Sequence, residues 1–254
     1  MEPDIDFAKY YDNHPEYVQL REDEAVHDFR LKIVDNWKIK YLFKVTPKNI
    51  RFGNIVEVGC ATGELIGRIP FDVAPHNRYG IDISSLNIAK SEKQFPGLNF
   101  FAGTFGQFVA GMPSSFEIDL AILSDVLEHV PDDLGLLKSV AERSKHILIN
   151  LPLEKCREYR NRQYGIDDER GHLRAYNISD AKNLIEKAGL QTNHFAVKYY
   201  VKEPIFRSYL WNKLILNTLG VNHLRNYFKY LYEILEITVN YRSYKSNFFA
   251  FLKK

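Results

Sequence analysis

A short apolar segment that runs directly into a glycine turn constrains the fold of this chain more than any other feature. Residues 54–58 (Asn-Ile-Val-Glu-Val) are predicted to form a buried strand, and a helix is predicted from Glu64 to Ile69. Between them, Gly59 and Gly63 allow the backbone to turn tightly and to approach a ligand without interference from Cβ atoms. Open α/β sheets bind ligands at such places, outside the carboxyl ends of their strands.

The chain then alternates between strand-like and helix-like segments. Ser84 or Ser85 is expected to cap the first of the later helices. Further strands are predicted at residues 79–83, 98–102, 118–123 and 146–151, and further helices at residues 86–94 and 132–144. This alternation predicts a doubly wound α/β fold with a parallel sheet covered on both faces.

The last third of the chain has a different pattern. A helix is predicted over residues 179–188, with Ser179 as its N-cap and Gly189 as its stop. Strands are predicted at residues 192–201 and 246–252, on either side of an aromatic-rich helical stretch. We therefore expect a seven-stranded Rossmann-like sheet whose last strand is antiparallel.

Three regions follow from these patterns. Residues 1–46 are expected to form an N-terminal helical lid, because apolar residues recur at helical spacing among charges until Pro47. Residues 47–204 and 237–254 are expected to form the ligand-binding core. Residues 205–236 are expected to form a helical cap inserted before the last strand.

Composition excludes several classes of protein. Of 254 residues, 45% are hydrophobic and 26% are charged, so the chain can build a sizeable core. The net charge of +2 is too small to indicate a nucleic-acid or membrane partner. Two cysteines, Cys60 and Cys156, provide no disulfide framework or zinc spacing. The sequence has no signal peptide and no apolar run of roughly 20 residues, so a cytoplasmic location is expected.

The glycine turn and a later acid together indicate a nucleoside ligand. The turn lacks the G-x-G-x-x-G pattern of dinucleotide sites, because Cys60 and Ala61 stand where a pyrophosphate would require glycine. Asp82 ends the second predicted strand roughly 20 residues after the turn, where a carboxylate can accept hydrogen bonds from both ribose hydroxyls.

Four segments resemble the class I S-adenosylmethionine (SAM)-dependent methyltransferases, in the branch of small-molecule enzymes that includes ubiquinone-biosynthesis (type 11) members. The segment 56–63 is similar to motif I of that family, E-x-G-x-x-x-G beginning at Glu57, and Asp82 stands at the position of the ribose-binding acid. The segments 119–130, 171–189 and 248–254 resemble the fourth strand, a G-H-L-R block with its helix, and the closing strand.

The resemblance implies SAM as cofactor and S-adenosylhomocysteine as product. Asp82 would hold the ribose, Ile83 would pack on the adenine, and Ser124 and Asp125 would close over the sulfonium end. Thr104 replaces the Asp that commonly meets the adenine amine. Tyr10, Tyr11 and Arg30 are candidates for a lid or for the SAM carboxylate, with ordinary helix packing as the alternative. The expected cofactor-binding residues are Tyr11, Arg30, Glu57, Gly59, Cys60, Ala61, Gly63, Asp82, Ile83, Thr104, Ser124 and Asp125.

Methyl transfer from a sulfonium is an in-line displacement, so the enzyme must mainly align the nucleophile and exclude water. An alcohol nucleophile also benefits from a general base, and histidine suits that role near neutral pH. His129 and His172 are the catalytic candidates, because both are predicted at the carboxyl edge of the sheet. A structural role is the alternative for each.

A metal site is a further alternative. Asp125, Glu128 and His129 are spaced to share one face of a helical turn, His172 could complete the set, and small-RNA 2′-O-methyltransferases have a similar arrangement. Such E-H-V runs are widespread in metal-free family members, and Asp125 is shorter than the usual Glu. No metal is therefore expected.

Three later features bear on the substrate. Residues 154–164 are predicted to form a basic lid, with a solvated loop as the alternative, and Arg174 and Tyr176 could bind a polar acceptor. The aromatic helices at 205–236 could cap the substrate, mediate a homodimer or touch a membrane surface, and core packing is the alternative.

The sequence favours a methyltransferase acting on O or N of a small molecule, such as a sugar, glycan component or lipid precursor. The open alternatives are a metal-dependent RNA 2′-O-methyltransferase, against which the near-neutral charge counts, and a SAM-binding regulator without activity.

Overall fold

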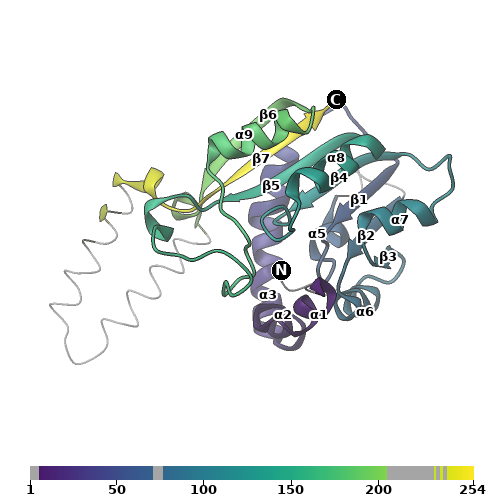
Figure 1. The fold of residues 1–254 in the computed structure, drawn as a ribbon, viewed down its shortest axis with the longest axis horizontal. Coiled ribbons are helices and arrows are strands. Elements are labelled where there is room, and N and C mark those ends of the chain that lie inside the picture. The colour runs from purple at the N-terminus through teal and green to yellow at the C-terminus, as the bar shows by residue number, and fades with distance from the viewer. Residues whose placement is uncertain (1–5, 71–76, 205–231, 233–234, 237–238) are drawn as a thin grey trace, which may run out of the picture.

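The computed structural model describes residues 6–70, 77–204, 232, 235–236 and 239–254, and its centre is one mixed sheet (Figure 1). The sheet has seven strands in the order β3-β2-β1-β4-β5-β7-β6. Neighbouring strands pair in parallel from β3 to β5, whereas β7 is antiparallel to both β5 and β6. The predicted seven-stranded sheet with an antiparallel last strand is therefore confirmed. The strands are β1 (Asn54–Val58), β2 (Asn77–Asp82), β3 (Asn99–Ala102), β4 (Ile118–Ser124), β5 (Ser144–Leu153), β6 (Gln191–Tyr199) and β7 (Ser246–Lys253).

Helices cover both faces of the sheet, and each face has its own hydrophobic core. Alternate residues of one strand enter different cores, because successive side chains of a strand point to opposite faces. In β4, Ala121 and Leu123 join the core beneath α7, α8 and α9, whereas Leu120 and Ile122 join the core beneath the N-terminal helices and α5. The helices are α1 (Phe7–Asn13), α2 (Pro15–Glu22), α3 (Glu24–Ile33), α4 (Lys40–Val45), α5 (Glu64–Arg68), α6 (Ser85–Gln94), α7 (Phe105–Gly111), α8 (Asp133–Arg143) and α9 (Ile178–Lys187).

The N-terminal helical segment is interrupted. Asp23 ends α2 and caps α3 by accepting from the N–H groups of Ala25 and Val26. The chain then continues from α3 through a π-helical stretch, Val34–Ile39, into α4, and this long run lies behind the sheet in Figure 1. It buries Trp37, which is fully enclosed against β7.

The helix caps match the sequence prediction at one position and differ at another. Ser84 caps α6, accepting from the N–H of Asn87, as one of the two predicted serines. The prediction of Ser179 as the cap of α9 is wrong: Asn177 is the N-cap and forms a reciprocal capping box with Asp180. An Asn three residues before an Asp satisfies two N–H groups at once, which Ser179 would not do from its position inside the helix.

The predicted cap at residues 205–236, which carried the expectation of a dimer contact, lies outside the described residues apart from positions 232, 235 and 236. Among the helices that the structure describes, none is long and apolar enough to cross a bilayer.

Phe249 offers a test of the packing between β7 and the N-terminal helices. Its fully buried ring contacts Trp37 and Tyr41, with ring centroids 5.7 and 5.5 Å away. Replacing it with Ala should lower the free energy of unfolding by about 3–5 kcal/mol, because the helices cannot close the cavity fully. Urea unfolding would measure the loss.

Phe195→Ala on the edge strand β6 is the matched control. Its ring is 48% exposed and stacks on Phe248, so about 1 kcal/mol should be lost. Equal losses in the two variants would contradict the assigned packing.

Candidate functional site

The carboxyl ends of β1, β2 and β4 lie level at one edge of the sheet. Val58 pairs with Ile81 on one side and with Leu123 on the other. The glycine turn leaves β1 here, and its first two N–H groups, of Gly59 and Cys60, both donate to the carbonyl oxygen of Ile81, at 2.7 and 2.9 Å. The turn is therefore fixed to the end of the neighbouring strand.

Gly59 is required by conformation and by space. Its φ is +73°, and a Cβ added there would lie 2.4 Å from Cγ2 of Val126. The segment that follows β4 thus lies directly against the turn. This contact places the histidine-bearing loop beside the expected cofactor position.

The Asp82 carboxylate joins the turn to the end of β2. One oxygen accepts from the N–H of Ala61 at 2.8 Å, and the other accepts from the N–H of Ser84 at 2.9 Å and from the Asn87 amide at 3.3 Å. Burial raises the pKa of Asp82, and the backbone hydrogen bonds oppose that rise. A carboxylate accepts about four hydrogen bonds, so one position stays available and a second requires displacing a weak donor such as Asn87. Ile83, half-buried, follows directly.

Two buried glutamates support the turn from below. Glu57 accepts from the N–H of Ile66 at 2.9 Å, and burial raises the pKa of its carboxyl to about 8. Glu64 lies 3.2 Å from His27 and 3.6 Å from Nε of Arg30. Burial would raise the pKa of Glu64, but the charge of Arg30 and the hydrogen bond with His27 hold it at about 2. Arg30, expected at the SAM carboxylate, therefore has an ion-pair partner within the protein.

Asp125 follows β4 in a left-handed conformation, with φ of 56°. Its carboxylate lies 2.8 Å from Lys38 Nζ and accepts from the Asn150 amide at 3.0 Å, and that amide also reaches Ser124 Oγ at 3.0 Å. Asn247 donates to Asp125 at 3.4 Å. Burial opposes the charged form, but Lys38 lowers the pKa of Asp125, which is therefore an ionised group at the strand ends.

Lys38, Asn150 and Asn247 were missed in the sequence. Asn150 lies in β5 and Asn247 in β7, so strand register could have indicated both. Lys38 reaches Asp125 from the π-helical stretch, and no pattern in the sequence predicts that irregularity. Stretches of π-helix are frequent at functional sites.

Glu128, His129 and His172 bring their ligating atoms within 4.8 Å of one another. Nδ1 of His129 lies 3.0 Å from the carbonyl oxygen of Gly171, which can only accept, so Nδ1 carries the proton and Nε2 has the lone pair. Burial lowers the pKa of His129 to about 3. Burial and the charge of Asp125 raise the pKa of Glu128 well above its usual range.

Glu154 lies behind His172 and orients it. Its Oε2 is 2.7 Å from Nδ1 of His172 and 2.8 Å from Arg162, and its Oε1 is 2.9 Å from Lys245 Nζ. Burial opposes ionisation, but the hydrogen bond from His172 and the charge of Lys245 hold the pKa of Glu154 well below its usual range. An ionised Glu154 accepts the Nδ1 proton of His172 and leaves Nε2 with its lone pair. The sequence did not indicate Glu154 or Lys245 individually.

The N-terminal helix α1 closes over this group. The Tyr11 hydroxyl donates to the carbonyl oxygen of His129 at 3.0 Å, and the Tyr10 hydroxyl donates to that of Ile166 at 3.0 Å. The Tyr11 and Tyr17 rings lie edge-on to the His129 imidazole. Tyr11 therefore lies in the site region, but its hydroxyl proton is already donated to a backbone carbonyl.

One expectation about this loop is wrong. Asp125, Glu128 and His129 do not share a helical face, because the left-handed Asp125 precedes a short turn in which the His129 N–H donates to Val126 O. Asp125 pairs with Lys38, and its carboxylate is not part of the group formed by Glu128, His129 and His172.

Arg174 and Tyr176, considered for the acceptor, instead hold backbone carbonyls of this loop. Arg174 donates to Leu127, Val130 and Pro131, and the buried Tyr176 hydroxyl lies between two acceptors, the Asp133 carboxylate at 2.5 Å and the carbonyl oxygen of Leu127 at 3.1 Å. Thr104 is exposed, and its hydroxyl is part of the capping box of α7.

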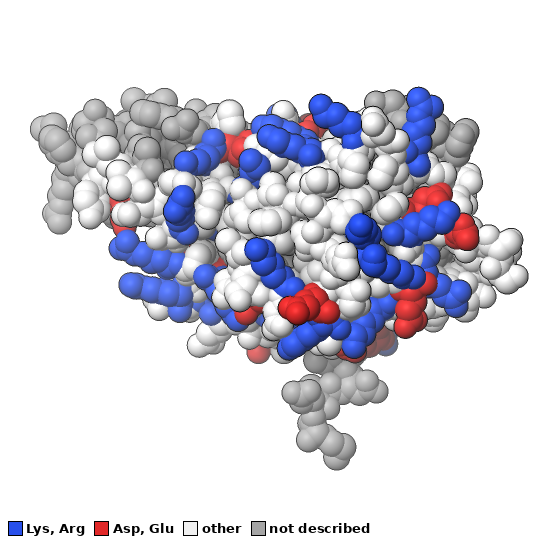
Figure 2. Space-filling view, turned by 90° about the horizontal axis from the view of Figure 1, so that it is seen from above, with Lys and Arg blue, Asp and Glu red and all other residues white. Residues whose placement is uncertain are grey.

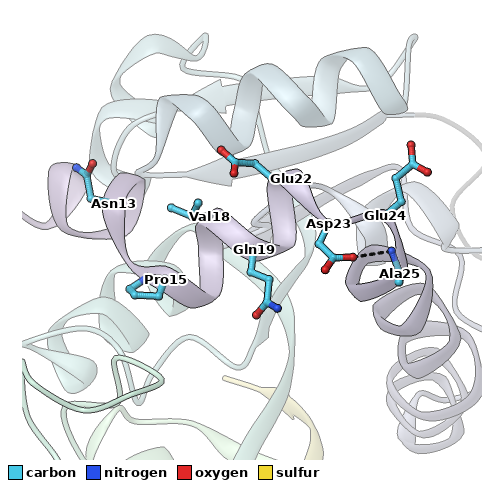
Figure 3. A pocket seen from close by; sticks show the side chains of 8 residues that line it. All are labelled: Asn13, Pro15, Val18, Gln19, Glu22, Asp23, Glu24 and Ala25. Atoms are coloured by element: carbon cyan, nitrogen blue, oxygen red, sulfur yellow. Dashed lines mark hydrogen bonds between the residues drawn. The ribbon is translucent and has the colours of Figure 1, made fainter.

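A wide hollow on the outside of the N-terminal helices does not belong to this site. Figure 3 shows its lining, which comes only from residues 13–25 and includes Glu22, Asp23 and Glu24. None of the site residues described in this subsection lines it. It is an open acidic surface, whereas the strand-end groups lie beneath α1.

Known proteins share this architecture and one family model matches the sequence. A methyltransferase domain model matches residues 34–194. A cyclopropane synthase from Mycobacterium tuberculosis is similar over 97% of this chain and 96% of its own, with 14% identity and a TM-score of 0.57. A magnesium protoporphyrin IX methyltransferase from Synechocystis, solved with SAM bound, is similar over 98% of this chain and 95% of its own, with 11% identity and a TM-score of 0.55.

A phosphoethanolamine N-methyltransferase from Haemonchus contortus has 14% identity over 98% of this chain and 60% of its own, with a TM-score of 0.60. None of the curated proteins matches the chain in sequence. The strand order with an antiparallel β7 and the family match over most of the chain lead to one conclusion. The chain belongs to the class I SAM-dependent methyltransferases.

Proposed function

We propose that this protein transfers the methyl group of SAM to an oxygen or nitrogen atom of a small molecule, at the wall formed by Glu128, His129 and His172. The observation that carries this proposal is the presence of two imidazole Nε2 lone pairs beside the cofactor turn. A nucleophile that attacks a sulfonium must lose or share a proton, and these atoms can accept its hydrogen bond.

The cofactor would lie along the edge formed by Gly59–Gly63, Asp82 and Asp125. Backbone of Gly59, Cys60, Ala61 and Gly63 would approach the methionine part without side-chain obstruction, with Glu57 supporting the turn. Asp82 would accept from the ribose, and Ile83 and Thr104 would flank the adenine. Ser124 and Asp125 would face the sulfonium end, with Tyr11 and Arg30 on the lid side.

The charge distribution favours a small acceptor over nucleic acid. The net charge is only +2, and on the face in Figure 2, which looks from the side opposite α1 and α2, Lys and Arg are scattered among uncharged side chains with acidic groups beside several of them. A groove that tracks a phosphate backbone would need contiguous positive charge. The similar methyltransferases named above, with a porphyrin or a phosphoethanolamine in their names, act on small molecules.

The Asp82 carboxylate provides the first test. Asp82→Ala should weaken SAM binding by about 1–3 kcal/mol, because ribose hydrogen bonds and the clamp on Ala61 are both lost. Isothermal titration calorimetry with SAM measures the change.

Asp119→Ala is the matched control. Asp119 also accepts from two backbone N–H groups, of Gly53 and Asn54, but at the opposite edge of the sheet. SAM affinity should stay unchanged in this control. If Asp82→Ala binds SAM as tightly as the wild type, Asp82 does not hold the ribose.

The His172 imidazole provides the second test. His172→Asn retains an amide N–H that can reach Glu154 but lacks the Nε2 lone pair, so single-turnover transfer should slow by about 10²-fold or more. Transfer would be followed with radiolabelled SAM and the best acceptor from a screen of hydroxylated and amino metabolites. SAM affinity should stay within about threefold of the wild type, because His172 acts on the acceptor.

His146→Asn, at the amino end of β5, controls for general loss of a histidine. A wild-type rate in His172→Asn would rule out this residue as a participant in the transfer.

A further inference from the structure

Glu128 differs from every other buried glutamate discussed above. Glu57 accepts a backbone N–H, Glu64 faces His27 and Arg30, and Glu154 faces His172 and two cations. Glu128 is 1% exposed, and neither of its carboxylate oxygens has a hydrogen-bond partner among the described residues. A buried carboxylate without partners is costly, so Glu128 must either hold a proton or meet a cation there.

The atoms that face Glu128 are also acceptors. Its Oε1 lies 3.8 Å from Nε2 of His129. The Nδ1 protons of His129 and His172 are already used by the Gly171 carbonyl and by Glu154, so both Nε2 atoms present lone pairs. The ligating atoms of three side chains therefore converge within 4.8 Å, and among the described residues no hydrogen bond links Glu128 to either histidine.

The groups behind the histidines have the arrangement found around metal ligands. A ligating imidazole commonly donates its other N–H to a carboxylate or a backbone carbonyl, which fixes the tautomer and the ring orientation. His172 donates to a carboxylate and His129 to a carbonyl. Glu154 is itself held by Arg162 and Lys245, so its charge is balanced and it stays behind His172 as a second-layer acceptor.

We propose that Glu128, His129 and His172 bind a divalent transition-metal ion through one carboxylate oxygen and two Nε2 atoms. Two imidazoles and one carboxylate suit Zn²⁺, Mn²⁺ or Fe²⁺, whereas Mg²⁺ and Ca²⁺ prefer oxygen ligands. Metal–nitrogen bonds of about 2.1 Å require the three ligating atoms to draw together by about 1 Å, which side-chain rotation can supply. The sequence had led to the opposite expectation of no metal.

The ion deepens the proposed function, and this part of the inference rests on it. Three protein ligands would leave room for an oxygen of the acceptor, and the ion would lower the pKa of a hydroxyl bound there. The hydroxyl proton would leave to solvent, the oxygen would form its bond to the methyl carbon, and the S–CH₃ bond would break with its electron pair left on sulfur. With the ion bound, the Nε2 atoms of His129 and His172 would hold the ion and would not accept the hydrogen bond of the nucleophile themselves, and the acceptor would be an alcohol or phenol.

Metal binding by the full-length protein tests the proposal without any acceptor. Chelator-treated protein would be dialysed against Zn²⁺, Mn²⁺ or Mg²⁺ and the bound metal quantified, with electron paramagnetic resonance for Mn²⁺. The expected result is one Zn²⁺ or Mn²⁺ per chain, with Mg²⁺ bound at least about 100-fold more weakly. Glu128→Gln and His172→Asn should each weaken binding by at least about 100-fold, and Glu154→Gln by about 10- to 100-fold.

Two controls make the outcome decisive. His146→Asn should bind metal as the wild type does, and circular dichroism would show that each variant is folded. Binding that is not stoichiometric, or that survives both Glu128→Gln and His172→Asn, overturns the proposal. Asp82→Ala should lose SAM affinity and keep the metal, so failure of the cofactor assignment and failure of the metal site are distinguishable.

Discussion

The Asp82 carboxylate is the point on which the arrangement of the site depends. It accepts N–H groups from Ala61 and Ser84, and so it ties the turn after β1 to the residues that start α6. The first N–H groups of the turn meanwhile bond to Ile81 O. Backbone N–H groups in a tight turn have no partner of their own, and an ionised carboxylate satisfies them strongly. The Asp82 carboxylate oxygens that fix the turn are also the atoms that would accept hydrogen bonds from a ribose. Cofactor binding would therefore be coupled to the conformation of the turn.

The second constraint is the left-handed conformation of Asp125. It changes the direction of the chain after β4, so the carboxylates of Asp125 and Glu128, three residues apart, lie in different surroundings. Asp125 turns to Lys38 and Asn150, where opposite charge stabilises its ionised form. Glu128 turns into the group of histidines beneath α1, where its oxygens have no hydrogen-bond partner in the described part of the chain. Because Val126 lies against Gly59, both carboxylates stay close to the glycine turn. One loop thus separates the acid that we propose to face the cofactor from the acid that we propose to face the acceptor.

Local patterns predicted the strands, the turn and the order of elements, because burial periodicity and glycine placement act over a few residues. The same reasoning proposed Gly59, Asp82 and the two histidines as site residues, and in the structure all four lie near the carboxyl edge of the sheet. It failed where partners come from distant segments. Arg174 and Tyr176 are polar residues near the expected site, yet backbone carbonyls of the loop after β4 take up their donors. The position of Lys38 beside Asp125 depends on the irregular π-helical stretch. The ion pair of Glu154 with Lys245 joins residues that are far apart in the sequence. Ser179 was preferred as a cap because the reciprocal pair of Asn177 and Asp180 was overlooked.

These failures show how two parts of the site differ: the wall that would hold the cofactor, and the wall that would face the acceptor. The proposed cofactor wall is made by backbone of consecutive residues and by the ends of adjacent parallel strands, and the fold that positions these elements is shared with proteins at 11–14% identity. The acceptor wall is assembled from side chains in the loop after β4, the segment after β5, the Gly171–Leu173 turn and the residue before β7. The loop after β4 does send Leu127 into one hydrophobic core, but the ionisable side chains of this wall belong to neither core, so they can change with little disturbance of the sheet. Similarity of fold therefore carries the cofactor chemistry from one member to another, whereas the acceptor must be inferred from the charges and lone pairs of this wall.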